Sequence, residues 1–479
     1  MSPPNHRPPN HRPASQTSQA STEPDGLTTA DLAQRLFLAL CLLEVLIILL
    51  RLYPSTADTV AGALRPIGGA GLLILTILTV PTASRAAQLV ASLAAIFCIA
   101  ILITGAAGLD SLIQGLARAL LFAGFLPALY LLRATADRQP RVRLSRRRLA
   151  GLPSGRRADG ITLGSHGFGA VLNTGSFPIM SAVIPRDADL EERRRFGLAA
   201  LRGMNLAPLW SPFFVAMALA SSYLPDTGLL EIAPVGLLIA LLSLIVSICL
   251  FGRVRGFHWG WVDGLRALVP ISGLLGGLGL AVVIASTVTP LATLEVIVLA
   301  VPPLCFALMA GRGNGIRGVL RQTYDRMGSG YDDLIIVVAA MTLAAMAAEV
   351  TFAGDLIRDQ IASQPVPLAI LGLIFLCFLP ALMGLHPMIP TAVMLAAMTT
   401  LDPASGYTAP LSDLVLMGVA LTAWSIGTMC SVSSLSVVVC SGLFRVPAWR
   451  FMLSPNLAFA AFVILIATLV LSAVQFLLG

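Results

Sequence analysis

Long apolar runs constrain this chain most, because each is close to the roughly 20 residues that a helix needs to cross a bilayer. Only 11% of the residues are charged and 57% are hydrophobic, against roughly 25% charged in soluble domains. The sequence therefore predicts an all-α polytopic membrane protein of about 11 transmembrane helices and excludes soluble catalytic folds. The runs are residues 35–53, 66–81, 86–106, 111–132, 197–222, 229–251, 268–289, 291–310, 334–352, 411–444 and 455–478.

Two further apolar segments, residues 161–184 and 367–399, are interrupted by prolines and polar residues. Irregular backbone at membrane depth is tolerated only where it is buried in protein or lines a wet cavity. We therefore predict two re-entrant hairpins, each entering and leaving by one face. Their tips read Asn173-Thr174-Gly175-Ser176-Phe177-Pro178 and His386-Pro387-Met388-Ile389-Pro390-Thr391.

The basic residues indicate the orientation of the chain. All 31 are arginine, and the net charge is +7. They concentrate in loops that fall on one side if the N-terminus is cytoplasmic, as the positive-inside rule requires. The first hairpin then opens from the cytoplasm and the second from the exterior, where the C-terminus also lies. This placement indicates contact with membrane lipid and no nucleic-acid partner. The arginine-rich loops are residues 133–160, 185–196, 252–267, 311–333 and 445–454.

An internal repeat relates the two hairpins. Trp210-Ser211 follows Pro178 by 32 residues, and Trp424-Ser425 follows Pro390 by 34. Proline, glycine and hydroxyl clusters around both pairs predict helices broken at mid-span. The expected units are a disordered cytoplasmic tail (1–30), a first inverted repeat (31–224; hairpin 161–184, broken helix 197–222), a second (225–445; hairpin 367–399, broken helix 411–444) and a terminal transmembrane helix (446–479).

Inverted repeats with discontinuous helices are typical of secondary transporters. Leu172-Asn173-Thr174-Gly175 resembles the Ser-Asn-Thr tip motif of divalent anion/sodium symporters, and Gly384-Leu385-His386-Pro387 resembles a Gly-Ile-His-Pro run in tripartite periplasmic transporter permeases. Over roughly residues 35–454 the chain thus resembles the ion transporter superfamily. The resemblance implies an elevator-type secondary transporter of a small anion, a dicarboxylate or another organic anion. It further implies a homodimer in the bacterial inner (plasma) membrane.

The candidate site combines the two tips with the two helix breaks. Helix N-termini and free backbone N–H groups attract an anion without an arginine, and unwound carbonyls with hydroxyls can hold sodium. The substrate-binding candidates are Asn173, Thr174, Gly175, Ser176, Ser211, His386, Pro387 and Thr391. The ion-coupling candidates are Ser425, Gly427, Thr428, Ser431, Ser433, Ser434 and Glu349.

Several alternatives stay open at this point. The coupling ion is either sodium, at the hydroxyls, or a proton carried by Glu349 or His386. His166 either gates the inner tip or marks the cytoplasmic boundary. The chain is either a complete transporter, a permease subunit of a tripartite system or an anion or metalloid efflux permease. A membrane enzyme is disfavoured because HExxH, GxGD and DDxxD motifs are absent. The seven cysteines form no CxxC pair, so no cofactor or metal is expected besides sodium.

Overall fold

The computed structural model describes residues 28–52, 54–153, 156–252, 260–310, 315–350, 361, 364–399, 411–452 and 454–478. The described residues are helical and include no strand. Nearly all of the tail predicted for residues 1–30 lies outside them. The first helices are α1 (Thr29–Arg51), α2 (Pro54–Thr79), α3 (Arg85–Thr104), α4 (Leu109–Ala119), α5 (Leu121–Asp137) and α6 (Pro140–Ala150). The middle of the chain adds α11 (Leu229–Phe251), α12 (Gly260–Val288), α13 (Thr293–Met309), α14 (Gly315–Met327) and α15 (Tyr331–Ala348).

The described part of the chain contains nine helical spans that are long and apolar enough to cross a membrane. Two of the eleven predicted runs are not among the nine: residues 291–310 form the shorter α13, and residues 197–222 form a helix interrupted in its middle. Many large apolar side chains on the outer helices are exposed, among them Leu42, Ile67 and Ile96. Such a surface is stable only against lipid or another chain. The fold is therefore that of an all-α polytopic membrane protein, as predicted.

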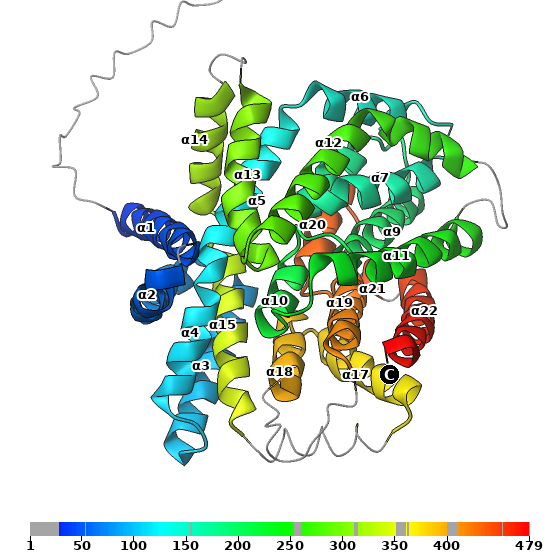
Figure 1. The fold of residues 1–479 in the computed structure, drawn as a ribbon. Helices are drawn as coiled ribbons and strands as arrows, with labels where there is room; N and C mark the ends of the chain where they lie inside the picture. The colour runs from blue at the N-terminus through cyan, green and yellow to red at the C-terminus, as the bar shows by residue number, and fades with distance from the viewer. Residues whose placement is uncertain are drawn as a thin grey trace, which may run out of the picture.

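Two helical paths pair with each other in the part built from α4, α5, α14 and α15. α4 continues into α5 at Leu120, and α14 is followed by α15 after a short turn. α15 packs against α4, whereas α14 packs against α5, so the two paths run antiparallel (Figure 1). Segment 311–333, predicted as a cytoplasmic loop, is thus largely helical. Val319, Thr323 and Met327 explain this, since their four-residue spacing buries one stripe of α14.

Both predicted hairpin segments are helix–turn–helix units. The first comprises α7 (Arg157–Leu172), the turn η2 (Asn173–Gly175) and α8 (Ser176–Ser181), and the second comprises α17 (Val366–Leu382) and α18 (Met388–Thr399). Each turn contains one residue with positive φ, Asn173 at 53° and Gly384 at 102°. Asparagine and glycine tolerate this backbone conformation better than other residues. The division of the chain into two inverted repeats stays a prediction.

Two other helices are broken where serine residues begin the break. One consists of α9 (Leu190–Asn205), η3 (Ala207–Leu209) and α10 (Val215–Tyr223), and the other of α19 (Asp413–Cys430) and α20 (Leu435–Phe444). In each break a serine Oγ accepts a hydrogen bond from the backbone N–H two residues later: Phe213 N to Ser211 Oγ (3.3 Å) and Ser433 N to Ser431 Oγ (3.4 Å). Ser431, rather than the Trp424-Ser425 pair, therefore corresponds to Ser211, and Trp424 and Ser425 lie inside continuous α19.

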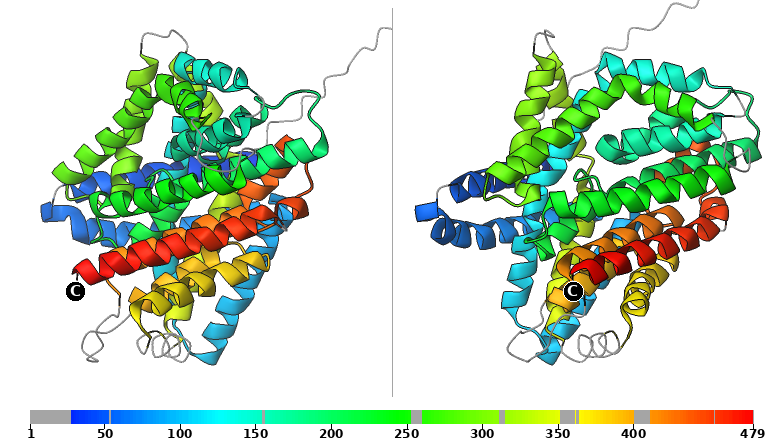
Figure 2. Two further views of the ribbon diagram at one scale, coloured as in Figure 1. Left: turned by 90° about the vertical axis from the view of Figure 1, so that its right-hand side faces the viewer. Right: turned by 45° about the vertical axis from the view of Figure 1, so that its right-hand side comes forward.

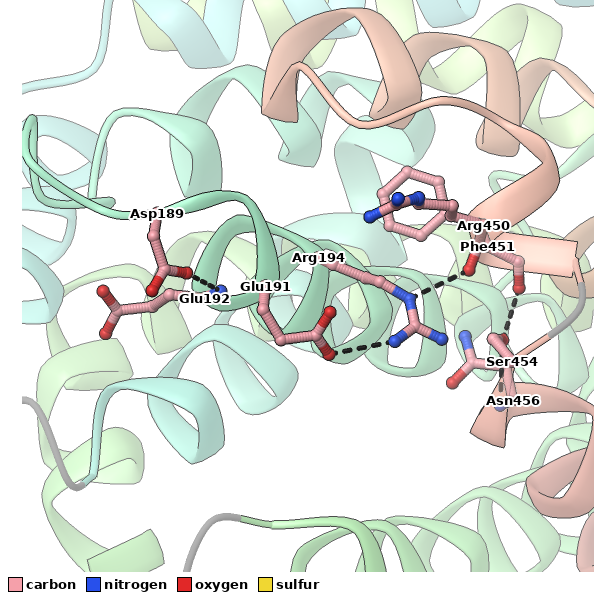
Figure 3. Close-up of polar contacts among 8 residues, drawn as sticks. All are labelled: Asp189, Glu191, Glu192, Arg194, Arg450, Phe451, Ser454 and Asn456. Atoms are coloured by element: carbon pink, nitrogen blue, oxygen red, sulfur yellow. Dashed lines mark hydrogen bonds and ion pairs between the residues drawn. The ribbon is translucent and has the colours of Figure 1, made fainter.

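The start of α9 is attached to the last helices, α21 (Trp449–Met452) and α22 (Pro455–Leu478). Asp189 Oδ1 accepts from Glu192 N at 2.7 Å and caps α9, while Arg194 pairs with Glu191 at 2.9 Å and donates to the Arg450 carbonyl at 3.1 Å (Figure 3). Deeper in α9, buried Arg202 donates to Asn456 Oδ1 of α22 at 2.8 Å. α22 in turn lies beside α11 (Figure 2). These contacts attach α9, the first part of the first broken helix, to α21 and α22.

Candidate functional site

A central cavity of about 120 Å³ lies where both hairpin tips, both broken helices and the paired helices α5, α14 and α15 meet. Its lining combines apolar side chains with a nearly equal set of polar and charged ones, and small-molecule sites likewise join apolar walls to polar groups that orient the ligand. The apolar lining is Leu126, Leu129, Val171, Leu172, Met204, Pro208, Phe213, Phe214, Val215, Ile336, Met388, Trp424 and Leu435. The polar and charged lining is Tyr130, Arg133, Asn173, Thr174, Asn205, Arg326, Asp333, His386, Thr428 and Ser436.

Both hairpin tips contribute to this cavity. Asn173 and Thr174 line it from the first tip, and His386 lines it from the second. His386 Nδ1 accepts a hydrogen bond from Met388 N at 3.3 Å, and its ring packs edge-on against Trp424 with 6.1 Å between centroids. Because the Met388 amide donates to Nδ1, the proton of a neutral His386 lies on Nε2, where it can serve as a donor.

The other substrate-binding candidates lie beside the cavity rather than in its lining. Ser176 is fully buried, and its Oγ has no hydrogen-bond partner among the described residues. Ser211 Oγ donates to the Ala170 carbonyl of α7, and Thr391 Oγ1 donates to the Pro387 carbonyl at 2.8 Å. Gly427 is packed against Pro387, whose Cβ lies 3.2 Å from where a Cβ of residue 427 would be. These residues shape the tips and their neighbours.

Of the ion-coupling candidates, only Thr428 lines the cavity. Ser431 Oγ and Ser433 Oγ lie 2.8 Å apart, and Ser434 Oγ donates to the Thr428 carbonyl at 2.6 Å. Ser425 is buried, and its Oγ has no hydrogen-bond partner in the described part of the chain. The hydroxyls of Ser431, Ser433 and Ser434 therefore lie close together at the start of α20.

Glu349 is not brought to the cavity. It follows the last residue of α15 and is exposed. Sequence reasoning extended the helix to residue 352 and so placed this carboxyl near the hairpin. An exposed carboxyl at a helix end has no contact through which to couple to the cavity.

Sequence reasoning missed a charged group on α5, α14 and α15. Arg133 of α5 is half-buried, and its Nε lies 2.8 Å from where a Cβ of Gly175 would be, so the guanidinium lies directly against the first tip. Tyr130 OH is 3.5 Å from Asp333 Oδ2, and the Arg326 guanidinium stacks over the Tyr130 ring at 6.0 Å. The cavity therefore has two cations and one acid, whereas the sequence analysis placed both arginines in loops.

His166 holds the first hairpin against the first broken helix. Its Nε2 accepts from Trp210 Nε1 at 3.2 Å, so the neutral ring donates from Nδ1 to the Gly203 carbonyl at 3.1 Å. The ring is buried and does not line the central cavity. Both ring nitrogens are satisfied, which assigns His166 a packing role in this conformation.

Metal ligands are not clustered in the described residues: no group of three or more His, Cys, Asp or Glu side chains is close enough to hold an ion. All seven cysteines are free. The hydroxyls around Ser431 bond to one another and to the Thr428 carbonyl.

Comparison with known proteins finds a likeness in structure. No family model matches the chain, and no curated protein matches it. Among solved structures, the crystal structure of the Alcanivorax borkumensis YdaH transporter, described as having an unusual topology, aligns with a TM-score of 0.53. The alignment covers 80% of this chain and 98% of that one at 14% sequence identity. The two proteins share a fold, and this chain is a multi-pass membrane protein. Sequence identity this low is evidence for the fold alone, so membership of the ion transporter superfamily stays a prediction from resemblance.

Proposed function

We propose that this protein is a secondary active transporter of a small organic anion, coupled to sodium or protons. The observation that carries the proposal is the position of the central cavity between both hairpin tips and both broken helices, in a chain with a transporter fold. A site at such a junction can be exposed to either side by moving the tips, which is the requirement for alternating access.

The charge of the cavity favours an anion. Arg133 and Arg326 are opposed by Asp333 as the only acid among the lining residues. Charges interact more strongly in a poorly solvated apolar site than in water, so an unbalanced cation there is costly and an anionic ligand offsets that cost. Asn173 and Thr174 add neutral donors at the tip that touches Arg133.

The movement that we propose is of the elevator type. The hairpins α7–α8 and α17–α18, with the broken helices, would move against the body formed by α1–α5 and α13–α15. Arg133 of α5 would then stay in place while the Asn173 tip leaves it. A homodimer in the bacterial inner membrane is part of the proposal, since exposed apolar faces on α1 to α3 need lipid or a second copy as neighbours.

Sodium is the coupling ion that we favour. The break between α19 and α20 gathers the hydroxyls of Thr428, Ser431 and Ser434 beside the cavity. The acid expected to carry a proton, Glu349, is exposed at the end of α15. His386 and Asp333 line the cavity and provide the proton alternative.

Counterflow tests the proposal directly. Proteoliposomes loaded with one unlabelled anion at high concentration are diluted into trace labelled anion, using a panel of monocarboxylates, dicarboxylates, phosphate and sulfate. We expect transient accumulation of at least one organic anion, lost in Asn173→Gly. Absence of counterflow for every anion, or counterflow of neutral or cationic solutes instead, contradicts the proposal.

A further inference from the structure

The full charges of the central cavity all come from one group of elements. Arg133 lies on α5, Arg326 on α14 and Asp333 on α15, and no other described lining residue is an arginine or an acid. The lining residues from α10, α18, α19 and α20 include no arginine or acid, and His386 at the second tip is the titratable residue on that side. A ligand therefore meets a cationic region on the side of α5 and a mainly uncharged wall elsewhere.

Within the charged group, Arg133 is the residue available to a ligand. It makes no close ion pair with any described residue, and its guanidinium is half-buried beside Gly175, although the carboxylates of Asp137 and Asp333 act on it at longer range. Asp333 instead faces the Tyr130 hydroxyl, and Arg326 stacks on the Tyr130 ring. The three formal charges of the lining sum to one positive charge, and Asp137, the other acid that acts on Arg133, does not line the cavity. A ligand with one negative charge therefore balances the lining.

The uncharged wall is suited to an apolar ligand body. Phe213, Phe214 and Val215 line the cavity from the start of α10, Met388 from the second tip and Leu435 from the start of α20. A cavity of roughly 150 Å³ with apolar walls accommodates benzene. The 120 Å³ here is close to that size. A second carboxylate placed against these side chains would be desolvated without a cation to pair with.

We infer that the substrate is a small amphipathic monoanion: one carboxylate bound by Arg133 and the Asn173 tip, on an apolar body about the size of a benzene ring. The inference rests on the proposed function, and it selects the monocarboxylate class in place of a dicarboxylate. Arg133 is the binding residue, because a guanidinium can hold a carboxylate through two parallel hydrogen bonds. Asp333 limits the bound charge to one.

Equilibrium binding of labelled benzoate to the full chain in nanodiscs tests the inference, with unlabelled succinate as competitor. We expect saturable benzoate binding that succinate displaces only at concentrations roughly tenfold higher or more. Arg133→Gln should weaken benzoate binding roughly tenfold or more. Arg133→Lys keeps the charge but loses the paired hydrogen-bond geometry. Its affinity for benzoate should therefore lie between those of the wild type and Arg133→Gln. Arg138→Gln is the matched control: this arginine lies on the same helical path, bonds Gln322 and does not line the cavity.

The contrary outcomes separate the inference from the proposed function. Succinate binding as tight as benzoate binding, or benzoate binding that Arg133→Gln leaves unchanged, overturns the inference. If benzoate does not bind but counterflow of a polyvalent anion is found, transport stands and the monoanion assignment fails. If benzoate does not bind and no anion shows counterflow, both fail. A monodisperse size-exclusion profile and an unchanged unfolding temperature of Arg133→Gln itself show that its loss of binding is not a loss of fold.

Discussion

The hydroxyl of Thr428 lies 2.8 Å from Asn205 Oδ1 and so joins α19 to the last residue of α9, its one proton being shared between this oxygen and the Trp424 carbonyl at 2.9 Å. Ser436 Oγ of α20 donates to the same oxygen at 3.2 Å, and all three residues line the central cavity. The two broken helices therefore meet through one buried amide. A change in either helix break alters the wall of the cavity as well as the packing.

Thr428→Val tests the energetic and ionic roles of this contact. Valine keeps the shape but removes the donor, so Asn205 retains only the weaker bond from Ser436. We expect the free energy of unfolding to fall by about 1 kcal/mol, measured by thermal or denaturant unfolding in detergent. If sodium binds at this break, the half-saturating sodium concentration for transport should also rise, because a methyl group cannot coordinate a hard cation. Thr428→Ser retains the hydroxyl and should behave as wild type. An unchanged sodium dependence in Thr428→Val removes Thr428 from the ion site.

Asn173 combines a backbone role with a side-chain role, and two substitutions separate them. Its φ of 53° strains any side chain other than asparagine or glycine. Asn173→Ala should lower stability by about 1 kcal/mol or more, whereas Asn173→Gly should be as stable as wild type. Both should lose transport, because both lack the amide. A transport-competent Asn173→Gly would contradict the role assigned to the tip amide.

Gly175 sets the distance between the first tip and Arg133. A Cβ at this position would lie 2.8 Å from Arg133 Nε, closer than side chains normally approach. The flexible guanidinium can move away, so Gly175→Ala should preserve the fold while weakening anion binding several-fold. Size-exclusion profiles and equilibrium binding measure the two effects. Binding at wild-type affinity would show that the position of Arg133 does not matter.

Gly203 permits the close approach of α9 to α7. A Cβ there would lie 2.0 Å from the Thr162 carbonyl, and this backbone atom cannot rotate away. Gly203→Ala should therefore destabilise the fold by about 1–3 kcal/mol or more, seen as a lower unfolding temperature and less monodisperse protein. Gly276→Ala is the control, since nothing lies within 4 Å of its added methyl. Equal stability of the two variants would contradict the packing of α7 on α9.

The sequence predicts the elements that depend on local pattern and misses those that depend on tertiary contacts. Apolar runs mark the membrane helices because burial in lipid is a property of each run alone. Asn173 and His386 are identifiable as tip residues because polar groups at membrane depth are tolerated only inside the protein or beside a wet cavity. Arg326 is missed because α14 shows only a three-residue buried stripe, and the segment reads as a charged loop.

The position of the second helix break shows the same limit. Trp424-Ser425 matches Trp210-Ser211 in letters, but α19 continues through it and breaks at Ser431, where serine hydroxyls compete for backbone hydrogen bonds. Arg133 belongs to the cavity only because α5 lies against the first tip. Neither fact follows from residue spacing, since both depend on how helices far apart in sequence are packed.

Accumulation of a labelled small carboxylate in proteoliposomes is the most direct test of secondary active transport of an anion. An inward sodium gradient is imposed, and the internal and external concentrations of the anion are compared at the peak of uptake. The account predicts an internal concentration above the external one, which collapses when an ionophore dissipates the gradient. Uptake that only equilibrates across the membrane, with sodium and proton gradients each imposed in turn, would contradict it.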